Sequence, residues 1–261
     1  MIKSLSKQEY DLLSTFAIKN RKVITVEDVK QSFNFSDGKM RVILHRLEKK
    51  GWLERIEKGK YLIVPLEGRE GWAEHPFIPL SKLVTNYYVS YRTALAYYGF
   101  TEQMPFHVLA ATTERKSTLE FQGYLYKFVR VKKRKFFGFE KIKISDAEIN
   151  IADKEKTMID CLDREEYAGS IIEIFKALHN NKEQFDFDRM INYALRMENH
   201  SLARRLGFLL DLVKQDTKKL EGRIGQFRYV HLSNTLPGKK YGISKKWRLI
   251  LNLKENELFK W

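Results

Sequence analysis

The chain has 261 residues, 43% of them hydrophobic, so it is long enough for two globular domains and too apolar for a disordered protein. No apolar run reaches the roughly 18 residues of a membrane helix, and the single cysteine, Cys161, excludes an internal disulfide and a cysteine-rich zinc site. The net charge of +15 favours a polyanionic partner such as nucleic acid, because an excess of like charge does not help a chain to fold.

The first residues, Met1 to Ser4, lack the apolar core of a signal peptide. We therefore expect a cytoplasmic protein.

The N-terminal segment carries two helix starts. Ser6 and Glu9 form a capping box, in which the serine side chain accepts from a backbone N–H and the glutamate reaches back. A shorter helix begins at Thr25 and ends near Phe33. The apolar face expected for the first helix consists of Tyr10, Leu13, Phe16 and Ala17.

A third helix and a basic hairpin follow directly. Ser36 is the N-cap of this helix and Gly51 ends it, and residues 52–56 and 60–64 read as two strands around a turn at Lys58-Gly59. The apolar residues Met40, Ile43, Leu44 and Leu47 recur at helical spacing. A helix followed by a two-stranded wing predicts a winged helix-turn-helix, a module that mostly binds DNA.

If those apolar residues face inward, a step of about 100° per residue fixes the outward face of the helix. Arg41 and Arg46 have the fork geometry that pairs with guanine O6 and N7. Ser36 and the helix N-terminus suit a backbone phosphate. The predicted DNA-binding residues are Ser36, Lys39, Arg41, Val42, His45, Arg46 and Lys49 on the helix, with Lys58 and Lys60 on the wing.

Residues 1–66 contain fourteen Lys and Arg against eight Asp and Glu. The alternative is a protein-interaction module whose charge is merely solvated, but a basic third helix favours DNA.

The predicted organisation is a winged helix over residues 1–64, a connector over 65–80 and a larger α+β domain over 81–261. The connector contains prolines, glycines and the aromatic residues Trp72 and Phe77, which indicate packing against a neighbour. In the larger domain Ser90 caps a helix that ends at Gly99, and four helices in series follow the strands. The predicted strands are 107–111, 124–131, 136–144, 148–151, 226–232 and 247–253.

Two more stretches of the larger domain are strongly basic. Residues 113–145 hold ten Lys and Arg against three Glu, and residues 217–248 hold nine against one. Their functional interpretation is a second nucleic-acid surface that extends the DNA footprint or touches an RNA, and the alternative is solvated charge. Phe128, Phe136, Phe137 and Phe139 lie among the charges, where they are either stacking platforms or, as their strand positions favour, core. The second basic surface consists of Arg115, Lys116, Arg130, Lys132, Lys133, Arg134 and Lys135.

The helix over residues 154–163 reads as structural. Asp153 is its predicted N-cap, with Met158, Ile159 and Leu162 facing the core and Cys161 buried as a small hydrophobe. We expect Asp160 and Asp163 to lie outside or to pair with Arg164, and their loose spacing does not favour a metal site.

One weak catalytic signal is present. Glu114-Arg115-Lys116 has the E-x-K spacing of a metal-dependent nuclease, for which Glu102 is the nearest second carboxylate. No glycine-rich phosphate loop, HExxH motif, nucleophile elbow or Cys/His cluster occurs, and the six histidines are scattered. The sequence therefore predicts no enzyme, no catalytic residues, no resident metal and no cofactor.

Several segments of the larger domain resemble AbiEi-type antitoxins. The most specific is 151–164, which is similar to the family stretch ERTLLDCLDR, with Lys156 where arginine is common; residues 166–169 continue it. Three further segments are similar to the family: a strand followed by a Ser-capped helix over 87–100, the next strand over 107–112 with Arg115-Lys116, and Lys135 to Gly138. The resemblance covers most of the chain and fades after about residue 215.

The resemblance implies an antitoxin and transcriptional autorepressor of a type IV toxin–antitoxin pair. The winged helix of such a protein binds repeats at its own promoter, and its C-terminal domain counters a nucleotidyltransferase-like toxin without a tight complex. The alternatives are a stand-alone repressor whose second domain senses a ligand or dimerises and, less favoured, the nuclease.

Overall fold

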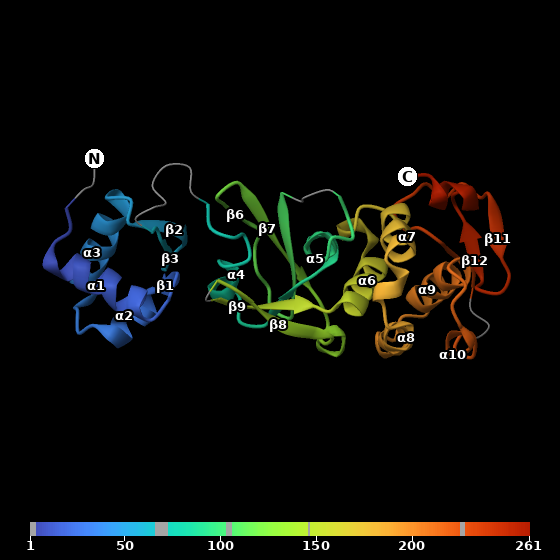
Figure 1. Cartoon of the computed structure of the whole chain (residues 1–261), viewed down its shortest axis with the longest axis horizontal. Coiled ribbons are helices and arrows are strands. Elements are labelled where there is room, and N and C mark those ends of the chain that lie inside the picture. Colours follow the sequence, from blue (N-terminus) through green and yellow to red (C-terminus); the bar gives the residue numbers. More distant parts are fainter. Residues whose placement is uncertain (1–3, 66–72, 103–105, 146, 225–227) are drawn as a thin grey trace. The chain divides into compact units, whose positions relative to one another are not determined.

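The computed structural model describes residues 4–65, 73–102, 106–145, 147–224 and 228–261 (Figure 1). Their contacts divide the chain into two compact units. The first contains residues 1–86, 119–124 and 141–149, and the second contains residues 87–118, 125–140 and 150–261. The domain boundaries expected from the sequence, 1–64, 65–80 and 81–261, stay a prediction.

The first unit opens with a three-helix winged helix. Its helices are α1 (Lys7–Ile18), α2 (Val26–Ser32) and α3 (Asp37–Lys49), and its strands are β1 (Val23–Thr25), β2 (Leu53–Glu57) and β3 (Lys60–Ile63). The strands pair antiparallel in the order β1-β3-β2. The expected helices and wing are confirmed, whereas β1 was not predicted, because three residues are too few for a periodic signal.

The apolar face of α1 differs from the predicted one. Tyr10 is 61% exposed and Ala17 is also exposed, while Leu12 and Phe16 are buried together with the carboxylate of Glu9. Glu9 closes the capping box with Ser6 and accepts from Lys50. These inward contacts of Glu9 place its side of the helix against the rest of the winged helix, which leaves Tyr10 and Ala17 in solvent.

The predicted connector packs where it is described. Phe77 and Ile78 are buried and lead into α4 (Leu80–Leu83). Gly68, Gly71 and Trp72, which also belong to the prediction, lie outside the described residues.

A six-stranded sheet has the order β6-β7-β5-β4-β9-β8. Its strands are β4 (Tyr87–Val89), β5 (His107–Thr112), β6 (Leu119–Phe121), β7 (Tyr124–Arg130), β8 (Phe139–Ile144) and β9 (Ala147–Ala152). The strand predicted from Phe136 therefore begins three residues late. Gly138 has a φ of +70° and breaks the extended run, so Phe136 and Phe137 turn toward the core instead.

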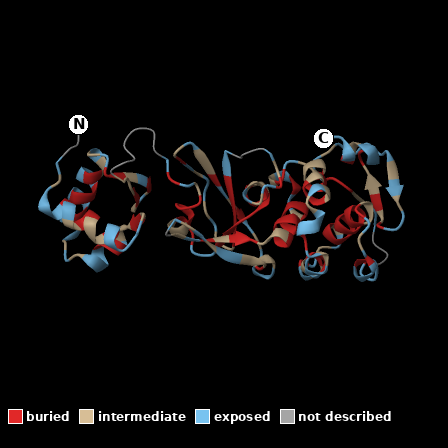
Figure 2. Ribbon diagram, viewed as in Figure 1, coloured by how far each residue is buried: buried red, intermediate tan, exposed pale blue. Residues whose placement is uncertain are grey.

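The second unit also contains several α-helices. They are α5 (Tyr91–Tyr97), α6 (Lys154–Asp163), α7 (Ile171–Asn180), α8 (Phe187–Arg196), α9 (His200–Leu212) and α10 (Lys218–Glu221). The four helices expected in series are confirmed as α6 to α9. Their inner faces are buried, as are Cys161, Met158, Ile159 and Leu162 of α6 (Figure 2).

A small sheet with the order β10-β12-β11 ends the chain, and its strands are β10 (Val230–His231), β11 (Gly242–Ser244) and β12 (Leu249–Leu251). The predicted strands over 226–232 and 247–253 are shorter than expected; residues 226 and 227 lie outside the described part. Strand β11 was not predicted, because Tyr241 to Ser244 has no extended apolar pattern.

The fold class is confirmed: a winged helix is followed by a larger α+β region. Within the described ranges, no helix combines the length and the apolar character that a membrane crossing needs.

Candidate nucleic-acid interface

Helix α3 presents a row of polar side chains to solvent. Its N-cap Ser36 accepts from the backbone N–H of Lys39 at 3.4 Å, so the helix begins where the sequence indicates. The inner face of α3 is buried. The outer face leaves Ser36, Lys39, Arg41, Val42, His45, Arg46 and Lys49 exposed, all of them residues that the sequence assigned to this face.

The start of α3 carries more positive than negative side chains. The one acidic side chain in its first turn, Asp37, lies 3.0 Å from Lys30 Nζ. The hydrogen bond from Lys30 lowers the pKa of the Asp37 carboxyl, so the carboxylate is offset by a partner on α2. Lys39 lies over the ring of Phe35, with its Nζ 5.1 Å from the centroid. The positive end of the helix dipole therefore meets mostly positive side chains.

The two wing lysines differ in their surroundings. Lys58 is exposed at the turn, where Gly59 adopts a φ of +77° that only glycine takes without strain. Lys60 is half-buried, and its Nζ lies 2.9 Å from the Glu57 carboxylate and 3.3 Å from the carbonyl oxygen of Leu83. Lys60 thus already has partners within the first unit, while Lys58 projects into solvent.

Two buried carboxylates hold the winged helix together. Asp28 accepts from the backbone N–H and the hydroxyl of Thr25, each at 2.9 Å, and from Arg21 Nη1 at 2.5 Å. Glu9 accepts from Lys50 Nζ at 2.6 Å. Burial opposes ionisation of both groups, but these hydrogen bonds outweigh it and lower the pKa of each carboxyl. Both carboxylates are therefore structural, and neither is paired with a cation on the exposed face of α3.

The second basic surface falls into two hollows of the second unit. The larger hollow, of about 990 Å³, lies where residues 130–135 face the start of α9. The smaller, of about 280 Å³, holds Arg115, Lys116 and Glu114, and Arg130 lines both. The structure therefore brings together the two parts of the surface that the sequence predicted, through one shared arginine.

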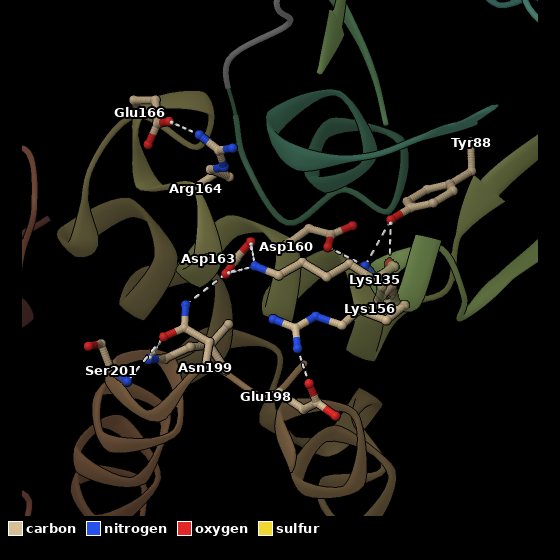
Figure 3. A network of polar contacts seen from close by, with 12 residues as sticks. Tyr88, Lys135, Lys156, Asp160, Asp163, Arg164, Glu166, Glu198, Asn199 and Ser201 are labelled. Carbon is tan, nitrogen blue, oxygen red and sulfur yellow. Dashed lines mark hydrogen bonds and ion pairs between the residues drawn. The ribbon is translucent and has the colours of Figure 1, made fainter. Parts of the chain in front are cut away.

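Two of its cations are neutralised by partners that the sequence did not indicate. Lys135 Nζ lies 2.6 Å from Asp163 Oδ1, and Arg134 is ion-paired with Glu198 (Figure 3). Lys132 and Lys133 are exposed, and across the described ranges no ion pair engages them. Lys132 and Lys133 therefore bring unneutralised charge to the lining of the larger hollow.

A charged network beneath this hollow corrects the expectation for α6. Asp160 is 2% exposed and forms an ion pair with Lys156, which stands four residues earlier on the same helix (Figure 3). Lys156 is fully buried, and its Nζ also donates to Tyr88 Oη at 2.8 Å. Asp163 pairs with Lys135 and not with Arg164, whose guanidinium lies 3.4 Å from Glu166. The prediction that these aspartates lie outside or pair with Arg164 was wrong.

The physical reason is helical spacing. Positions 156, 160 and 163 stand at i, i+4 and i+7, so they share one face of the helix. The spacing is present in the sequence, but spacing alone does not show whether that face of the helix is buried or exposed. Burial raises the pKa of the Asp160 carboxyl even though Lys156 opposes the shift. Ser90 occupies the predicted cap position of α5, yet its hydroxyl donates to Asp160 Oδ2 at 2.8 Å and makes no cap hydrogen bond.

The residues of the nuclease hypothesis are not brought together. Glu102 lies 3.2 Å from Lys176, and it does not line the hollow that contains Glu114 and Lys116. Glu114 is the one carboxylate lining that hollow. Over the described part of the chain, no group of three His, Cys, Asp or Glu is placed to hold a metal ion.

Residues 11–64 match the sequence model of transcriptional regulators of the AbiEi antitoxin type. The chain is also similar in fold to the crystal structure of the RV2827C protein from Mycobacterium tuberculosis, with a TM-score of 0.70 over 98% of this chain and 95% of that chain. The two sequences are 13% identical, so this likeness concerns the fold alone. No curated protein matches the chain by sequence.

Proposed function

We propose, from the match of residues 11–64 to the AbiEi antitoxin transcriptional regulators, that the protein is the autorepressor and antitoxin of a type IV toxin–antitoxin pair. Helix α3 reads the major groove of repeats at its own promoter. The second unit counters a nucleotidyltransferase-like toxin without forming a tight complex with it.

The observation that carries the DNA-binding part is the composition of the exposed face of α3. Arg41 and Arg46 stand on the outward face at a spacing of five residues, with His45 between them. Arginine is the side chain that pairs bidentately with guanine, and each such pair discriminates by about 1–3 kcal/mol. Ser36, Lys39 and Lys49 flank them and suit phosphates. Lys58 extends the contact to the backbone beside the groove.

The second basic surface gives the second unit a means of touching nucleic acid. Arg130, Lys132 and Lys133 at the larger hollow would contact phosphates and not bases, because no Phe, Tyr or Trp is among the described residues that line it. We assign this surface to an RNA contact or to an extension of the DNA footprint.

The decisive experiment is binding to the DNA upstream of the gene, against scrambled DNA, over a salt series. Binding that survives at about 200 mM salt on upstream DNA alone is expected for an autorepressor. Arg46→Ala should cost about 1–3 kcal/mol and relax the preference at one base. Lys58→Ala should weaken all sequences alike.

Lys19→Ala is the matched control, because Lys19 is also an exposed cation but is the C-cap of α1 and belongs to neither α3 nor the wing. It should leave both affinities unchanged. Wild-type affinity in both Arg46→Ala and Lys58→Ala would refute the assignment of this interface. A nucleotidyltransferase gene beside this one supports the antitoxin, and its absence supports a stand-alone repressor.

A further inference from the structure

The outer face of the C-terminal sheet carries exposed aromatic side chains. In this sheet Ile243 of β11 and His231 of β10 both stand opposite Ile250 of β12, so the three side chains share one face. Leu249, the next residue of β12, is fully buried and therefore points to the other face. The row through Ile250 thus forms the solvent side of the sheet.

Two tyrosines extend this solvent side, each two residues before a member of the row. Tyr229 precedes His231 and is 39% exposed, and Tyr241 precedes Ile243 and is 44% exposed. The guanidinium of Arg248 lies 5.7 Å from the ring centroid of Tyr229, and Lys239 Nζ lies 5.3 Å from that of Tyr241. Each exposed ring is therefore accompanied by a cation.

The charge around these rings has one sign. Residues 228–248 contain six Lys and Arg and no Asp or Glu. Lys246 is paired with Asp211 and Glu221. Lys239, Lys240 and Lys245 are exposed, and no described carboxylate forms an ion pair with them. A cationic face with exposed rings is complementary to a polyanion that also offers flat π surfaces.

We propose that this face, defined by Tyr229, Tyr241, Arg248 and Lys239, binds single-stranded RNA by stacking unpaired bases on the two tyrosines. The lysines and the arginine hold the phosphates between the bases. Base faces are available for stacking only where a strand is unpaired. RNA exposes such bases in loops and at ends, whereas chromosomal DNA is mostly duplex, and this favours RNA as the occupant.

The inference rests on the RNA contact proposed above and adds a face that adjoins residues 130–135, because Arg228 and Val230, on either side of Tyr229, line the larger hollow. It also makes a specific physical claim. A merely basic patch would respond to charge alone, whereas a stacking face loses affinity when its rings are removed and its charge is kept.

The test is fluorescence anisotropy of full-length protein with a labelled oligouridine of about 12 nucleotides, a length within the range of single-strand binding sites. Tyr229→Ala with Tyr241→Ala should weaken binding by about tenfold or more, and Tyr229→Phe with Tyr241→Phe should retain it. RNA duplex of the same length should compete poorly. Tyr97→Ala removes a ring of the same 44% exposure from α5 and should have no effect.

Operator binding through α3 is measured on the same variants and should be unchanged, which keeps a failure of this inference apart from a failure of the proposed function. Wild-type RNA affinity in the double alanine variant would overturn the inference, as would equal competition by duplex.

A cross-linking experiment in cells identifies the nucleic acid. The nucleic acid that cross-links to the wild type, and no longer cross-links to the double alanine variant, should be digested by ribonuclease. Digestion by deoxyribonuclease instead would refute RNA as the occupant.

Discussion

At the scale of single residues, the buried pair of Lys156 and Asp160 is the least expected feature of the second unit. Removing one partner leaves an uncompensated charge in the core, which typically costs about 3–5 kcal/mol. Asp160→Asn and Lys156→Met should each lower the free energy of unfolding by that order in urea titrations. Replacing both together should cost less than either single change, because no buried charge remains.

The control for this pair is Lys141 with Glu148, whose ion pair spans 2.8 Å while both side chains are more than two-thirds exposed. Lys141→Ala should change stability by about 0.5 kcal/mol or less. A cost for Asp160→Asn no greater than that of Lys141→Ala would contradict the role assigned to the buried pair.

Acid sensitivity of the winged helix follows from Glu9 and Asp28. Their carboxyl pKa values are lowered in the folded state from ordinary values of 4.5 and 3.8. On acidification these two carboxyls therefore become protonated in the unfolded chain before they do so in the folded protein. The stability that the two carboxylates contribute is complete above about pH 5 and is lost as the pH falls through their lowered pKa values. Urea unfolding at pH 7 and pH 3 should show this loss, and Asp28→Asn should reduce it. The same pH dependence in Asp28→Asn and wild type would contradict it.

At the scale of elements, Gly207 lets α9 approach the C-terminal sheet. A Cβ at this position would overlap the ring of Trp247, which is buried and donates from Nε1 to Asp211 Oδ2 at 2.6 Å. Alanine favours a helix over glycine by about 1 kcal/mol, but overpacking typically costs about 1–3 kcal/mol. Because the overlap is with a buried ring, Gly207→Ala should lower the thermal midpoint.

Gly38 in α3 provides the opposite case, since a Cβ there would meet nothing within 4 Å. Gly38→Ala should therefore stabilise the protein by about 0.5–1 kcal/mol. A stabilising Gly207→Ala would show that α9 and Trp247 are free to separate, against the packing described here.

At the scale of the whole molecule, repression and antitoxin action should be separable. Arg46→Ala removes the proposed base contact of the first unit, so it should relieve repression of a promoter fusion while still rescuing growth beside the gene of the proposed toxin. For a surface that contacts RNA, Lys132→Ala with Lys133→Ala should keep operator affinity and lose rescue, whereas for an extended DNA footprint it should lower operator affinity. Loss of both activities in both variants would contradict the division of roles between the two units.

The elements of both units were largely predictable, because their signals are local. Ser36 and the spacing of Met40 to Leu47 predicted α3 and its exposed face, and the capping box of Ser6 with Glu9 predicted the start of α1. The errors share one cause. The position of Tyr10 or Asp160 on its helix does not determine its burial, which depends on packing against segments distant in the sequence; Asp160, for example, also accepts from Ser90.

The sequence by itself determined the winged helix, the fold class, the net positive charge and the solvent-exposed arginines of the third helix. These features follow from periodicity, caps and turn glycines, which act over a few residues. Only the tertiary structure decided which charges remain available. Lys135 and Arg134 meet Asp163 and Glu198, and Tyr229 and Tyr241 reach one face because β10 and β11 pair with the same strand. Such pairings depend on the register and packing of distant segments, which no local pattern encodes.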